Sequence, residues 1–121
     1  MGIIANIDPI TGIVVCRLSE QMVKENSEIF IRELNAAIEK AKPQKIKVLT
    51  DCAGMTKLPD DVGKNIISAG IKNNRPYIEK SAICGLNTFT RIAARLILTL
   101  SGRHDILIFA TKEEAIKWLQ T

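Results

Sequence analysis

The sequence predicts one α/β domain built on a mixed five-stranded sheet. The chain has 121 residues, of which 46% are hydrophobic and 25% are charged, which is the size and balance of a single globular domain. Short apolar runs alternate with longer segments of helical periodicity in the order ββαβαβαβα. A strand, a helix and a further strand normally form a right-handed crossover that leaves the two strands parallel. We therefore expect residues 1–121 to form an N-terminal antiparallel hairpin and then parallel strands, covered by about four helices.

The first third of the chain predicts the hairpin and the first helix. Apolar runs at residues 2–7 and 13–18 flank a turn segment, Asp8-Pro-Ile-Thr-Gly12, and this pattern is typical of a β-hairpin. Ser19 is placed to cap a helix that runs to about residue 41. The apolar face of this helix consists of Phe30, Leu34, Ala37, Ile38 and Ala41.

The remaining elements follow in strand and helix pairs. Residues 45–51 predict a strand, and a helix begins at Asp60 or Asp61 with an apolar face of Val62, Ile66 and Ala69. Residues 80–85 and 105–110 predict two more strands, separated by a helix over 87–100. In the last helix, which begins at Thr111, that residue and Glu114 have the spacing of a capping box.

The helix predicted over 87–100 is apolar almost all the way round. Thr88, Arg91, Arg95 and Thr99 form only a thin polar stripe. Such a helix is either deeply buried or half of an interface. We expect a homodimer or a partner contact that includes Arg95 and Leu98. Two alternatives are that the helix lines an apolar ligand pocket and that it is ordinary core.

Composition excludes several classes of function. Aromatic residues make up only 4%, which argues against the stacking platforms of single-strand nucleic-acid binders. No apolar run approaches the roughly 20 residues of a membrane span, because Arg91 and Arg95 interrupt the longest candidate. Three scattered cysteines and the lack of a signal peptide predict a cytoplasmic protein. We expect no nucleic-acid partner and no transmembrane segment.

One polar cluster is a candidate binding site. Ligands of open α/β sheets bind beyond the carboxyl ends of the parallel strands, where helix N-termini also attract anions. Asn87, Thr88, Thr90 and Arg91 lie at such a helix start. They predict a shallow site for an anion or carboxylate. The alternative is that Asn87 and Thr88 only cap the helix.

The sequence offers little for catalysis or for a cofactor. Cys52 and Cys84 are expected near each other at strand ends, but two thiolates alone make a poor zinc site. His104 has no nucleophile with which to pair, and Asp51 is the only candidate general base. We therefore expect no enzyme activity, no cofactor and no metal.

Several segments together resemble the STAS domain, and within it the SpoIIAA-like (STAS/SEC14-like) family. They are Asp8-Pro-Ile-Thr-Gly12, Val48-Leu-Thr-Asp51, Ser81-Ala-Ile-Cys-Gly85, Ile106-Leu-Ile-Phe109 and Glu113-Glu-Ala-Ile-Lys-Trp-Leu119. The resemblance covers almost the whole chain and implies the fold of bacterial anti-sigma-factor antagonists. In those proteins a partner kinase phosphorylates a serine in the pattern Asp-Ser-Ser-Gly. The matching segment here is Asp60-Asp61-Val62-Gly63, so Asp61 and Val62 stand where the family has its two serines. In the same loop, Thr56 is the remaining hydroxyl that could accept a phosphate.

Two hypotheses for function follow. The first is a non-enzymatic STAS-like interaction or regulatory module that binds a protein partner or itself, without the family's phosphorylatable serine. The second, implied by the SEC14-like side of the resemblance, is a binding protein or sensor for a small amphipathic or anionic molecule such as a lipid or acyl acid. A cavity of several hundred cubic ångströms would favour the second hypothesis, and a solid core would exclude it.

Overall fold

The computed structural model describes residues 3–18, 21–55, 57–100 and 105–121. Five strands form one sheet in the order β1-β2-β3-β4-β5. β1 and β2 are antiparallel, and the other neighbouring pairs are parallel, so the predicted sheet is confirmed. The strands are β1 (Ile3–Ile7), β2 (Val14–Leu18), β3 (Ile46–Asp51), β4 (Ile78–Cys84) and β5 (Ile106–Ile108).

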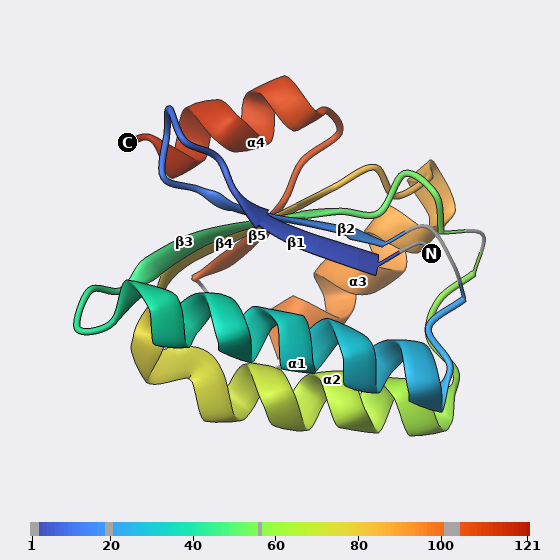
Figure 1. Cartoon of the computed structure of the whole chain (residues 1–121). Coiled ribbons are helices and arrows are strands. Elements are labelled where there is room, and N and C mark those ends of the chain that lie inside the picture. The colour runs from blue at the N-terminus through green and yellow to red at the C-terminus, as the bar shows by residue number, and fades with distance from the viewer. Residues whose placement is uncertain (1–2, 19–20, 56, 101–104) are drawn as a thin grey trace.

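The helices cover the two faces of the sheet unequally (Figure 1). α1 and α2 lie side by side on one face with α3 on the same side, while α4 lies alone on the opposite face. Among the described residues, none of the helices is both long and apolar enough to cross a membrane. The helices are α1 (Lys24–Ala41), α2 (Asp61–Asn74), α3 (Thr88–Leu100) and α4 (Lys112–Leu119), with a short 3₁₀ turn at Arg75–Tyr77.

The apolar face predicted for α1 is confirmed, but the predicted helix start is wrong. Phe30, Leu34, Ala37 and Ile38 are buried against the sheet. α1 begins only at Lys24, and its N-cap is Val23, which has no capping side chain. Ser19, the predicted cap, lies outside the described residues.

The face predicted for α2 is also wrong. Val62 is 52% exposed and Ala69 is exposed, whereas Gly63, Gly70 and Asn74 are the buried residues of this helix. These small and polar residues pack against α1, where the Asn74 amide donates a hydrogen bond of 2.6 Å to Asn35. Helical periodicity of apolar residues misled the prediction because the buried contact of α2 is made by glycine.

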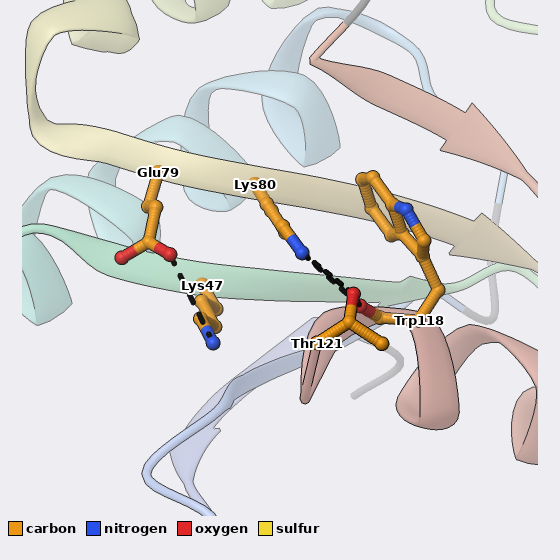
Figure 2. Close-up of polar contacts among 5 residues, drawn as sticks. All are labelled: Lys47, Glu79, Lys80, Trp118 and Thr121. Carbon is orange, nitrogen blue, oxygen red and sulfur yellow. Dashed lines mark hydrogen bonds and ion pairs between the residues drawn. The ribbon is translucent and has the colours of Figure 1, made fainter.

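α4 packs on β3 and β4, and side-chain contacts hold it at both ends. At its start, the Thr111 hydroxyl accepts a hydrogen bond from the N–H of Glu114 at 3.2 Å, so the predicted cap is confirmed. At its end, Lys80 Nζ donates to the carbonyl of Trp118 at 3.3 Å and to Thr121 Oγ1 at 2.9 Å (Figure 2). The same ammonium lies 4.9 Å from the centre of the Trp118 ring. A cation at a helix C-terminus satisfies its free carbonyls and complements its dipole.

Candidate functional site

An apolar cavity of about 170 Å³ lies between the sheet and the helix pair α1 and α2. The floor is formed by the strands, the roof by α1 and α2, and one end by the segments that follow β3 and β4. The lining residues of these parts include Val48, Thr50, Ser81, Ile83 and Ile106 in the floor, Phe30, Leu34, Ile67 and Ile71 in the roof, and Met55, Leu58, Pro59 and Leu86 at the end.

The cavity exists because α2 packs on α1 and not directly on the strands. Gly63 and Gly70 let the two helices approach closely. A Cβ at Gly63 would collide with the carbonyl oxygen of Met22, and one at Gly70 would collide with the side chain of Ile31. Ile67 and Ile71 then form the wall of the cavity on the same helix, and they do not reach far enough to fill it.

The described lining residues carry no charge. Apart from sulfur atoms, their polar groups are the hydroxyls of Thr50 and Ser81 on neighbouring strands. A cavity of this character holds apolar molecules readily, because water gains few hydrogen bonds there. An ionised group inside it would lose its hydration without finding a counter-charge. The site is therefore suited to a small and largely apolar molecule.

The four residues of the predicted anion site do lie together, at the start of α3. Asn87 Oδ1 accepts a hydrogen bond from the N–H of Thr90 at 2.9 Å and another from the Thr90 hydroxyl at 3.0 Å. Asn87 therefore caps the helix, as the alternative interpretation expected. Thr88 is exposed and Arg91 is half-buried. An anion site at this position stays a prediction.

The predicted interface residues of α3 occupy different positions. Arg95 Nη2 donates a hydrogen bond of 3.0 Å to the carbonyl of Ile108, which ties α3 to the end of β5. Leu98 is half-buried, whereas Ile92 on the same helix is 61% exposed. Self-association through α3 stays a prediction, and Ile92 is the more accessible apolar side chain.

The segment that matches the family's switch lies at the first turn of α2. Asp60 is the N-cap, and its Oδ1 accepts a hydrogen bond of 2.7 Å from the N–H of Gly63. Asp61 and Val62 are exposed on the outer side of the same turn. Thr56 and His104 lie outside the described residues.

The cysteines are buried, and burial favours the protonated thiol. Cys52 and Cys84 lie side by side as predicted, because the N–H of Cys52 donates to the carbonyl of Cys84 at 2.8 Å. Burial raises the pKa of Cys52 to about 12 and that of Cys84 to about 11. Within the described part of the chain, no group of three or more potential metal ligands occurs.

Asp51, the candidate general base, shapes the turn that follows β3. Its Oδ1 accepts a hydrogen bond of 3.0 Å from the N–H of Ala53. Gly85 has a φ of +86° and lies so close that a Cβ there would collide with the backbone of Ala53. This packing gives the Asp51 carboxylate a structural role at the strand end.

A second hollow, of about 260 Å³, lies beside α4 and over β1 and β2. Arg17 and Lys112 line it, together with Asp8. Hydrogen bonds from the N–H groups of Ile10 and Thr11 hold the pKa of Asp8 below its usual value, and nearby Lys112 adds to this effect. The hollow thus contains both signs of charge.

Sequence reasoning considered an apolar ligand pocket only along the helix over 87–100 and did not predict a cavity between α2 and the sheet. The available signal was the pair of glycines seven residues apart in α2, because residues at this spacing share one face of a helix. Such a face suits close helix packing, and it turns Ile67 and Ile71 toward the sheet. The prediction followed the apolar residues of this helix and gave the two glycines no packing role.

Comparison with solved structures shows the same fold in three bacterial proteins. One is an uncharacterised protein with a SpoIIAA-like fold from Shewanella loihica, which is 19% identical and has a TM-score of 0.70. The match covers 97% of this chain and 91% of that chain. A putative anti-sigma factor antagonist from Thermotoga maritima is 16% identical, with a TM-score of 0.70 and coverage of 98% and 95%. An anti-sigma-factor antagonist (STAS) domain protein from Planctomyces limnophilus is 16% identical, with a TM-score of 0.66 and 98% of both chains covered.

A search of the curated proteins finds no match. The SpoIIAA-like family model matches residues 13–120, which is nearly the entire chain from the second strand onward. The matched region contains the apolar cavity and the first turn of α2. The resemblance expected from the sequence is therefore confirmed, and the chain belongs to the SpoIIAA-like family.

Proposed function

We propose that this protein is a non-enzymatic regulatory module that binds a small, largely apolar molecule in the cavity beneath α1 and α2. The cavity of about 170 Å³ is the observation that carries the proposal. In another protein, an apolar cavity of about 150 Å³ binds benzene, so this one is large enough for a ring or a short chain. It is smaller than the several hundred cubic ångströms expected for a whole lipid. A small occupant is therefore the better fit.

The regulatory part of the proposal rests on the position of α2. Ile67 and Ile71 contact the cavity from one side of this helix, while Asp61 and Val62 are exposed in its first turn. Leu58 and Pro59 also line the cavity and lead directly into that turn. An occupant thus touches the segment that presents Asp61 and Val62 to a partner. In this scheme cavity occupancy replaces serine phosphorylation as the signal at the start of α2.

The test is a titration of the ¹⁵N-labelled full chain with toluene, followed by two-dimensional NMR. Toluene should cause saturable shifts of amide signals from β3, β4 and α2, and smaller shifts in α4. In the variant Ile67→Phe, the larger side chain fills the cavity and should abolish binding. Val62→Phe is the matched control, because it adds the same ring to the outer side of the same helix and should leave binding intact.

Two results would count against the proposal. One is the absence of saturable shifts in the wild type, and the other is toluene binding that Ile67→Phe leaves unchanged. Native mass spectrometry of the freshly purified protein, compared with a denaturing run, then identifies the mass of a natural occupant.

The exposure of Ile92 favours self-association through α3 as a second candidate function. A large apolar side chain that is 61% exposed is a typical interface residue when its neighbours are also apolar. Size-exclusion chromatography with light scattering on the wild type and Ile92→Glu tests this candidate. A dimer that becomes a monomer in the variant supports it, and a wild-type monomer removes it. Arg95 is unsuitable for this test because it already bonds Ile108 within the chain.

A further inference from the structure

We infer that the ligand of the apolar cavity is electrically neutral and carries one hydrogen-bonding group, a hydroxyl or a carbonyl, which Thr50 and Ser81 bind. This inference rests on the proposed function and specifies the chemical class of its ligand. It distinguishes alcohols, phenols, ketones and esters from pure hydrocarbons and from ionised acids.

The two hydroxyls are placed to receive such a group. Thr50 pairs with Ile83 and Ser81 pairs with Val48 in the parallel ladder, so they are diagonal neighbours on one face of β3 and β4. Both line the cavity, and Thr50 is only 8% exposed. Both hydroxyls line the cavity, so a polar group of a ligand inside it can form hydrogen bonds with them.

The rest of the lining limits what the hydrogen-bonding group can be. No described residue around the cavity is charged, and most of the described side chains that line it are those of Ile, Leu, Val, Phe and Met. A carboxylate or phosphate would enter without a counter-ion and would lose most of its hydration energy. A hydroxyl or carbonyl loses much less on leaving water and recovers it from the two side chains. The apolar part of the same ligand is stabilised by contact with the remaining lining residues.

The structure also limits ligand size. At roughly 30 Å³ for each water-sized group, 170 Å³ holds about six such groups. A six-membered ring with one substituent is therefore a suitable probe. Phenol and toluene have the same shape and differ only in the hydroxyl, and benzoate presents an ionised group on the same ring.

The experiment titrates the ¹⁵N-labelled full chain at pH 7 with phenol, toluene and benzoate in parallel. Phenol should bind the wild type, and benzoate should bind at least about tenfold more weakly than phenol. Thr50→Val keeps the shape of the side chain and removes its hydroxyl, and Ser81→Ala does the same at the second position. Each should weaken phenol binding about threefold to tenfold and leave toluene binding within about twofold of the wild type. Thr50→Ser retains the hydroxyl and should retain phenol binding.

The outcomes separate this inference from the proposed function. The inference is wrong if toluene binds but phenol does not. It is also wrong if the double variant Thr50→Val, Ser81→Ala binds phenol as well as the wild type does. In both cases the cavity remains a binding site. Benzoate binding tighter than phenol would also overturn the inference. If neither phenol nor toluene binds, the proposed function fails together with the inference. Comparison of Thr50→Ser with Thr50→Val keeps the test valid when Ser81→Ala is poorly folded.

Discussion

The two faces of the sheet are packed in different ways. On one face α4 lies directly on β3 and β4, and Leu49, Ala82, Ala115 and Leu119 are all fully buried. On the other face α1 lies on the sheet, but α2 lies beside α1 and leaves the apolar cavity. The core between α4 and strands β3 and β4 is thus well filled by a helix of eight residues, while two helices of 18 and 14 residues together with α3 leave a space over the same strands.

The positions of the small residues explain this difference. Ala82 on β4 and Ala115 on α4 are both fully buried in the core between the sheet and α4, so that helix can approach the sheet closely. In α2 the small residues are Gly63 and Gly70, and both face α1. A helix comes closest to a neighbour on the side where its side chains are smallest. The side of the helix that carries its small residues therefore decides whether the helix packs closely on the sheet or leaves a space above it.

Substitution of Gly63 should have the largest effect on this arrangement. In Gly63→Ala the new Cβ meets the fixed carbonyl of Met22, so α2 must move away from α1. We expect a loss of about 2 kcal/mol in the free energy of unfolding, since overpacking outweighs the better helix propensity of alanine. Urea unfolding followed by Trp118 fluorescence measures it.

Gly70→Ala is the matched control for this substitution. There the new Cβ meets the flexible side chain of Ile31, which can change rotamer. The loss should be well below that of Gly63→Ala. Equal losses at both positions would mean that the backbone contact at Met22 is not what positions α2.

Adding bulk to each face should have opposite effects. Ala82→Val inserts two methyl groups into the sealed face and should cost about 1–2 kcal/mol. Val48→Ile extends a side chain into the cavity on the neighbouring strand and should be neutral or should stabilise by up to about 1 kcal/mol. Thermal unfolding of both variants is the measurement. A penalty for Val48→Ile as large as that for Ala82→Val would show that the cavity is closed in solution.

Removal of the Lys80 contacts at the end of α4 should have a moderate effect on stability. Lys80→Met keeps the alkyl stem but loses the hydrogen bonds to Trp118 and Thr121 and the contact with the indole ring. We expect about 1 kcal/mol of destabilisation. Lys47→Met is the control, because Lys47 forms a surface ion pair with Glu79 at 3.9 Å, and its loss should cost less than about 0.5 kcal/mol (Figure 2). Similar values for the two variants would contradict a specific role of Lys80.

The smallest expected difference is in thiol labelling. Cys52 lines the cavity, whereas Cys84 belongs to the sealed core under α4. A small apolar reagent, methyl methanethiosulfonate, should modify Cys52 about threefold to fivefold faster than Cys84, as measured by peptide mass mapping. This corresponds to about 1 kcal/mol or less. Faster labelling of Cys84 would reverse the assignment of open and sealed faces.

The thiols also predict a pH dependence of stability. Burial raises the pKa of Cys52 to about 12 and that of Cys84 to about 11, against an ordinary value of 9.0. The folded chain keeps these protons in the range where the unfolded chain loses them, so the unfolded state binds fewer protons. Stability from this source is complete below pH 9 and falls as the pH rises from 9 toward 12. Cys52→Ala should reduce the slope of unfolding free energy against pH in that range.

Several features were predictable because they depend on local chemistry. The order of elements along the chain, the antiparallel hairpin, the buried face of α1 and the Thr111 cap follow from periodicity, turn residues and a capping pattern. The start of α1 and the buried face of α2 did not follow from these rules. α1 begins without a capping side chain, and the buried face of α2 is set by a tertiary contact through glycine rather than by an apolar stripe.

The same division applies to the candidate site. The proximity of Asn87, Thr90 and Arg91 follows from the sequence because the three residues share the first turn of α3, and an anion site there stays a prediction. The sequence did not reveal that Thr50 and Ser81, which are distant from each other in sequence, line a cavity with Ile67 and Ile71. Their proximity requires the ladder between β3 and β4 and the lateral shift of α2. Neither is encoded in a short segment.

The sequence by itself determined the order of the elements, the class of the sheet and the family, because apolar periodicity and turn chemistry act within a few residues. Only the tertiary structure decided that α2 packs on α1 through Gly63 and Gly70 and leaves a space above the strands. The physical reason is that close packing depends on matching surfaces from distant segments. A cavity is the volume that those surfaces fail to fill, so it is visible only once all of them are in place.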